Sequence, residues 1–176
     1  MEGIPRCARN AKGGGVHNGG MNFLRYFMSL SLVAWVGGIL FFISLTPILF
    51  SVLPSRHMAG SVVSPALTRL HWIGIISGVL FLVSSLAYSR FTTGDARLWS
   101  AANLFVALML ALTCISQFGL SPRLAAIRAE TPVMDSAPAD VRERFDALHQ
   151  WSTRIEGGVL LLGLIAVYLV SREPVR

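Results

Sequence analysis

The sequence predicts an all-α fold, an integral membrane bundle of four antiparallel helices, on the basis of three observations. The chain of 176 residues is 53% hydrophobic and only 14% charged, whereas a soluble domain is about one-quarter charged. Four apolar stretches are long enough to cross a bilayer, which takes about 20 residues. The short apolar alternation of a membrane β-barrel is absent from the sequence. Helices are therefore expected, because a segment in lipid must satisfy its own backbone hydrogen bonds.

The sequence divides into a tail and one membrane domain. Residues 1–20 are rich in glycine and lack apolar periodicity, which predicts a disordered N-terminal tail. Residues 21–176 are expected to form the four-span membrane domain. The spans are predicted at residues 23–53, 66–88, 98–118 and 151–171, with an amphipathic lead-in helix at residues 138–150.

In the first predicted span, Trp35 is followed by Gly37 and Gly38, which would allow a neighbouring backbone to approach closely. Pro47, after Thr46, favours a bend near the far end of this span. The next connector is short, so the second span should pack antiparallel to the first.

The second span carries a face of small residues together with a histidine: His71, Gly74, Gly78 and Ser85 share it at helical spacing. A histidine in this position either has its hydrogen bonds satisfied at a helix interface or is a ligand of a bound group. In the third span, Asn103 and Gln117 are expected to form hydrogen bonds across helices.

Two features are predicted between the third and fourth spans. Pro122 is expected to break or redirect the chain, and residues 124–130 are expected to form a short surface helix. From Pro138 onward, apolar residues recur at helical spacing, which predicts the lead-in helix running into the fourth span.

Polar residues gather at one end of the predicted bundle. In an antiparallel four-span chain, the starts of the second and fourth spans lie at the same end as the ends of the first and third. We call the group of residues expected there the polar corner: Arg69, His71, Gln117, His149, Ser152, Arg154 and Glu156. Glu156 should be paired or carry a proton, because a lone carboxylate inside a membrane is costly.

The polar corner allows several interpretations. Glu156 could form an ion pair with Arg69 or Arg154 that locks the bundle. His71, His149 and Glu156 could hold a copper or other divalent ion. His71 and His149 could instead be axial ligands of haem b. Glu156 could also relay protons or bind a cationic solute.

Other function classes have little support in the sequence. The formal net charge of +6 comes from basic residues spread over tails and loops, with no aromatic-interleaved patch, so nucleic acid is not an expected partner. No HExxH, CxxC, P-loop or nucleophile-elbow motif occurs, which favours a non-enzymatic role. The distribution of Lys and Arg slightly favours cytoplasmic termini in a cell inner membrane.

The order of short motifs resembles a known membrane family. These motifs are Trp35-x-Gly37-Gly38, Pro47 after Thr46, Ala59-Gly60, Pro122, and Leu148-His149-x-x-Ser152 with a polar residue at 156. The chain resembles, from about residue 22 to 171, an uncharacterised four-span family, domain of unknown function four-one-four-nine. That family is similar to the membrane domain of the copper-resistance protein CopD and, more remotely, to haem-binding membrane proteins of the protoporphyrinogen oxidase type.

The resemblance implies a four-helix bundle without an agreed activity. The family usually has asparagine where this chain has Glu156, and CopD-like proteins have a histidine ahead of Trp-x-Gly-Gly, where this chain has apolar residues, Ser29 and Ser31. The expected role is a membrane protein that handles a cation or small solute, or supports a membrane assembly, through the polar corner. The alternatives are a haem-binding or copper-related redox protein and a purely structural subunit. The expected partners are the lipid bilayer and another membrane protein or a second copy of the chain.

Overall fold

The structure, a computed structural model, describes residues 11–94, 99–131 and 136–172. Within these ranges the elements are α1 (Ala11–Val52), α2 (Arg56–Thr93), α3 (Ala101–Ile115), the π-helical turn η2 (Ser116–Leu120), α4 (Ser121–Glu130) and α5 (Ala139–Ser171). The elements α3, η2 and α4 follow one another without a break and form one helix, Ala101–Glu130. The described residues thus contain four helices that are long and apolar enough to cross a membrane, which confirms the predicted all-α membrane bundle.

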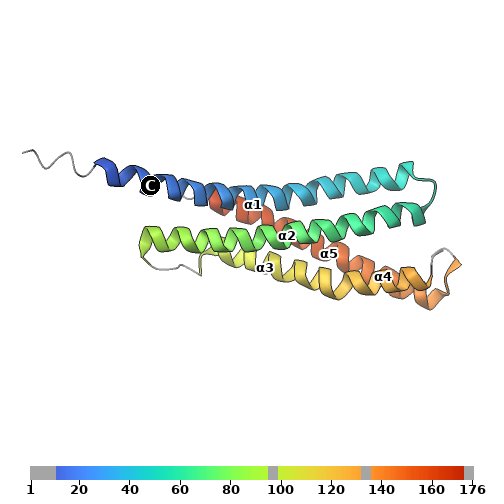
Figure 1. The fold of residues 1–176 in the computed structure, drawn as a ribbon. Helices are drawn as coiled ribbons and strands as arrows, with labels where there is room; N and C mark the ends of the chain where they lie inside the picture. The colour runs from blue at the N-terminus through green and yellow to red at the C-terminus, as the bar shows by residue number, and fades with distance from the viewer. Residues whose placement is uncertain (1–10, 95–98, 132–135, 173–176) are drawn as a thin grey trace, which may run out of the picture.

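The helices pack in a closed ring. α1 packs on α2, α2 on α3, α3 on α5, and α5 again on α1. In Figure 1 the helices run side by side, and the C-terminal end of α5 lies beside the N-terminal half of α1. The starts of α2 and α5 therefore lie at the same end of the bundle as α4 and the end of α1.

Polar caps define several helix ends. The side-chain oxygen of Ser55 accepts a hydrogen bond from the backbone N–H of Met58 at 3.2 Å. That of Ser100 accepts one from Asn103 at 3.2 Å. These bonds satisfy backbone donors that have no partner within the first turn of a helix. α2 ends at Gly94, whose φ of 78° is the left-handed conformation typical of a helix C-cap.

The helices extend further than the predicted spans. α1 begins at Ala11, inside the segment predicted to be a disordered tail, and residues 1–10 of that segment lie outside the described residues. α2 begins at Arg56, ahead of the predicted start at residue 66, and contains Pro65. Extending an existing helix costs far less than nucleating a new one, so polar flanks can continue an apolar span.

Pro122 does not break the helix, so this part of the prediction is wrong; residues 124–130 are helical as predicted, but they continue the helix of α3 and η2 and do not form a separate one. Pro122 occupies the first turn of α4, directly after η2. A proline inside a helix lacks an N–H and clashes with the carbonyl group four residues earlier. The wider π turn, in which Ser121 N–H donates to the carbonyl oxygen of Ser116, accommodates the proline without ending the helix.

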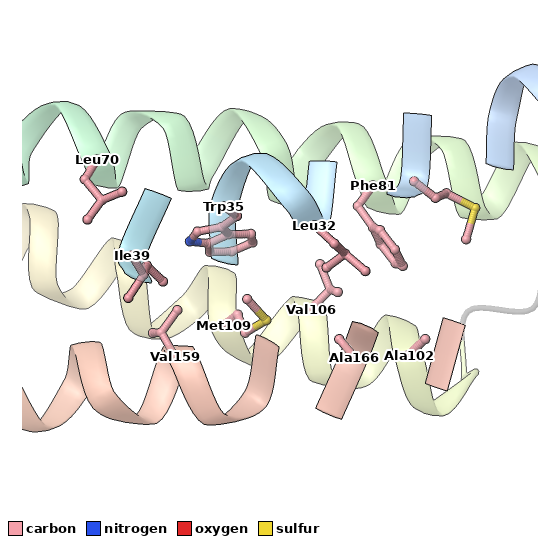
Figure 2. Packing of buried hydrophobic residues seen from close by; sticks show 11 residues of the cluster. Leu32, Trp35, Ile39, Leu70, Phe81, Ala102, Val106, Met109, Val159 and Ala166 are labelled. Carbon is pink, nitrogen blue, oxygen red and sulfur yellow. The ribbon is translucent and has the colours of Figure 1, made fainter. Parts of the chain in front are cut away.

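The core is centred on Trp35 of α1, which is almost completely buried. In Figure 2, side chains from all four spanning helices surround it, among them Phe81, Met109 and Val159. The indole lies against Gly74 and Gly78 of α2, where an added Cβ would come within 3 Å of its ring atoms. The predicted face of small residues on α2 therefore receives a large aromatic side chain from α1.

We expect Gly74→Ala to lower the free energy of unfolding by about 1–3 kcal/mol, because the new methyl group would overlap Trp35 and overpack the core. The matched control is Gly37→Ala, since no heavy atom lies within 4 Å of a Cβ built at Gly37. Denaturation of the detergent-solubilised variants would measure both effects. Equal stability of the two variants would contradict this account of the α1–α2 contact.

Candidate functional site

His71 of α2 is the buried centre of a polar cluster and is only 1% exposed. Its Nδ1 lies 2.8 Å from Oε1 of Gln117, which belongs to η2. Its Nε2 lies 2.6 Å from Oε1 of Glu156 on α5. We call these three residues the His71 cluster; it joins α2, η2 and α5 near the middle of the spanning helices, and not at the end of the bundle where the polar corner was expected.

The π turn η2 carries Gln117 to the histidine. A π turn inserts one extra residue into a helix and is often found at functional sites. The π turn was not predicted from the sequence, although Pro122 just after it indicates that the hydrogen bonding of the helix changes there. Gln117 was predicted to form a hydrogen bond across helices, and its bond to His71 confirms this.

Ser116, the first residue of η2, adds an unusual polar group. Its hydroxyl oxygen is fully buried and has no hydrogen-bond partner among the described residues. Leaving a buried hydroxyl unpaired costs about 1–3 kcal/mol. The turn that carries Gln117 therefore also carries a polar atom whose hydrogen bonding is incomplete.

The hydrogen bonds of the cluster define where its protons lie. Oε1 of Gln117 only accepts hydrogen bonds, so Nδ1 of His71 must donate to it. The short contact between Nε2 and Glu156 then needs one more proton, carried either by the carboxyl group or by the imidazole. In both cases the cluster holds one shared proton and has no net charge.

The arginines of the polar corner do not pair with Glu156, so the expected ion pair with Arg69 or Arg154 is wrong. Arg69 is exposed, and the guanidinium of Arg154 lies 5.6 Å from the ring centroid of Trp151. Arg69 precedes His71 by two residues and Arg154 precedes Glu156 by two. Residues two apart on a helix point in very different directions, so neither arginine shares the inward direction of the cluster.

His149 also lies outside the His71 cluster. It is exposed on α5, and its ring stacks on that of Phe145 with the centroids 6.1 Å apart. Ser152, one turn further along the helix, is buried. Helical spacing puts His149, Ser152 and Glu156 on one side of α5, at positions i, i+3 and i+7, yet His149 is exposed whereas Ser152 and most of Glu156 are buried.

The described residues do not form the predicted metal or haem ligand sets. Within them, no group of three His, Cys, Asp or Glu side chains could hold a metal ion. Both ring nitrogens of His71 are engaged by Gln117 and Glu156, and His149 faces the surroundings. The structure therefore does not bring His71 and His149 together as ligands of one ion or of a haem.

Four apolar spanning helices around a buried polar cluster define an integral membrane protein. The chain belongs to the family described as Domain of unknown function (DUF4149), whose model matches residues 30–132, more than half of the sequence. The match includes His71 and Gln117, and Glu156 follows it on α5. No curated protein and no solved structure matches the chain, and the similarity to CopD is not shown by these comparisons.

Proposed function

We propose that this membrane protein handles a cation at the His71 cluster and that the cluster itself binds and releases a proton. The single observation that carries the proposal is the buried contact of 2.6 Å between His71 and Glu156. A histidine paired with a carboxyl group is a common proton-exchanging unit, and ionisable residues inside membrane helices usually mark ion or proton pathways.

Release of the shared proton would leave a negative charge among apolar helices. Burying an uncompensated charge is costly, so the empty state of the cluster would attract another cation or a cationic solute. Glu156 is 13% exposed while His71 is 1% exposed, so the carboxyl group is the member of the pair nearer to the surroundings. We infer that protons or other cations reach the cluster through Glu156.

We also propose an inner-membrane location with both termini on the cytoplasmic side. Among the described residues four helices could span the membrane, an even number that would put both termini on one side, and Lys and Arg are slightly more frequent on that side in the sequence.

Transport measurements on the protein reconstituted into liposomes would test the proposal. We expect proton movement, driven by a membrane potential and followed with an internal pH dye, to fall by about a hundredfold or more in Glu156→Gln. Removing a positioned proton-transfer group typically has an effect of this size. Repeating the assay with sodium or potassium gradients would identify any cation that exchanges with the proton.

Glu143→Gln is the matched control, because Glu143 is an exposed acid on the same helix. It should leave the rate unchanged, and so should His149→Ala. A native protein without measurable flux, or equal rates in the native protein and Glu156→Gln, would exclude the proposal.

A structural role is the second candidate, and one observation favours it. The His71 cluster ties α2, η2 and α5 together and engages both nitrogens of the histidine. In this role the chain would be a subunit that supports a membrane assembly with another membrane protein or a second copy of itself. Loss of stability in Glu156→Gln, without any flux in the native protein, would favour this role.

A further inference from the structure

A cavity of about 300 Å³ lies toward the end of the bundle where α2 and α5 end, separate from the His71 cluster, and is lined by residues of α1, α2 and α5. Its polar lining consists of Arg25, Ser29, Tyr88 and Ser171, and the remaining lining residues are apolar. Two of these, Val33 and Val167, are 67% and 39% exposed, so the cavity opens toward the surroundings of the helices. In a membrane those surroundings are lipid.

Arg25 gives this cavity a positive charge. The side chain is half-buried, and no salt bridge joins it to another described residue. The acidic residues that the structure describes all lie on α4 and on α5 no further than its middle, away from this cavity: Glu130, Asp140, Glu143, Asp146 and Glu156. The described part of the chain therefore supplies no carboxylate to this guanidinium.

We propose that the cavity binds an anionic phospholipid, with its phosphate on Arg25 and part of one acyl chain along the apolar lining. A guanidinium matches a phosphate with two parallel hydrogen bonds, and the hydroxyl groups of Ser29 and Tyr88 line the same cavity as further donors. The hydroxyl group of Ser171 donates instead to the carbonyl oxygen of Tyr168. A volume of 300 Å³ is at the lower limit for ligand pockets, which fits a segment of one chain rather than a whole lipid.

The headgroup, rather than the tail, should determine which lipid binds. Lipid tails in the bilayer are already in an apolar environment, so moving a chain onto the protein brings little hydrophobic gain. A basic residue near the membrane surface favours an anionic lipid by about 1 kcal/mol, which corresponds to about a fivefold preference.

Native mass spectrometry of the detergent-solubilised full chain would test this site with phosphatidylglycerol and phosphatidylcholine of identical acyl chains. The native protein should bind phosphatidylglycerol about fivefold more tightly. Arg25→Gln should abolish the preference. Arg90→Gln, which removes an exposed arginine at the same end that does not line the cavity, should retain it.

Val167→Trp provides a second test that leaves every charge in place. It tests whether a lipid occupies the cavity even if Arg25→Gln does not fold. A bulky ring in the cavity should reduce the binding of both lipids by excluding the acyl chain. The proposal is overturned if the native protein binds the two lipids equally, if Arg25→Gln and Arg90→Gln lose the preference alike, or if Val167→Trp binds lipid as the native chain does. These outcomes do not depend on the function of the His71 cluster.

Discussion

Replacing His71 by alanine is expected to lower the free energy of unfolding by about 3–5 kcal/mol, because it removes one partner of a buried pair of ionisable groups and leaves the other unpaired. The substitution would leave the carboxyl group of Glu156 without its only ion-pair partner among the described residues. Oε1 of Gln117 would lose its hydrogen-bond donor at the same time. Denaturant titration of the protein in detergent, followed by circular dichroism, would measure the loss.

His57→Ala is the control for this experiment, because His57 is exposed at the start of α2. A surface substitution of this kind should change stability by no more than about 0.5 kcal/mol. An equally small loss in His71→Ala would show that the buried pair does not form in the membrane-extracted protein.

The double variant His71→Leu with Glu156→Leu separates stability from function. Replacing both members of a buried pair with apolar residues of similar size is often neutral or stabilising, so the double variant should recover most of the stability lost in His71→Ala. A folded double variant without proton flux would assign the cluster to cation handling. If the double variant folds and keeps both the stability and the proton flux of the native protein, the cluster contributes neither to stability nor to cation handling.

The sequence was sufficient to predict that His71, Gln117 and Glu156 lie at one level along the bundle, but not that these three touch or that this level is near the middle of the helices. Alternating spans place the starts of α2 and α5 at the same end, and His71, Gln117 and Glu156 do lie together. The partner of Glu156 depends on how each helix is rotated about its own axis. That rotation is set by packing such as the fit of Trp35 against Gly74, and helical spacing alone does not determine it.

The helix boundaries, too, could be predicted only in part from the sequence. Hydropathy identified the apolar centres of the four spans, whereas an extension such as residues 11–20 of α1 carries little apolar signal. Pro122 indicates that the helical hydrogen bonding changes near it, but it does not specify a π turn at Ser116–Leu120. Since Gln117 lies in this turn, the detailed geometry of the cluster could not have been predicted from periodicity.

Gln117→Leu is expected to lower stability by about 1–3 kcal/mol and to change the protonation of His71. The substitution removes the acceptor of the Nδ1–H bond, and an unpaired buried donor costs this much. The fraction of His71 with a proton on Nδ1 should therefore fall. Nitrogen NMR of protein with labelled histidine would report this fraction, because protonated and unprotonated ring nitrogens have well-separated chemical shifts.

Gln117→Glu is the informative comparison, since a carboxylate of nearly the same shape still accepts the Nδ1–H bond. It should keep the proton on Nδ1, whereas Gln117→Leu should not. If Gln117→Leu shows the same histidine spectrum as the native protein, the bond to Gln117 does not control the tautomer.

The same comparison distinguishes a proton-handling cluster from a structural one. A glutamine amide offers an acceptor on one side and a donor on the other, so a half-turn of the amide would let Gln117 bond His71 both with and without a proton on Nδ1. An ionised glutamate only accepts, and its negative charge would favour the proton-loaded cluster. A cluster that releases protons during function should therefore work more slowly in Gln117→Glu, even though its hydrogen bonds are preserved. A purely structural cluster should tolerate that variant, because it needs only one stable arrangement of the three side chains.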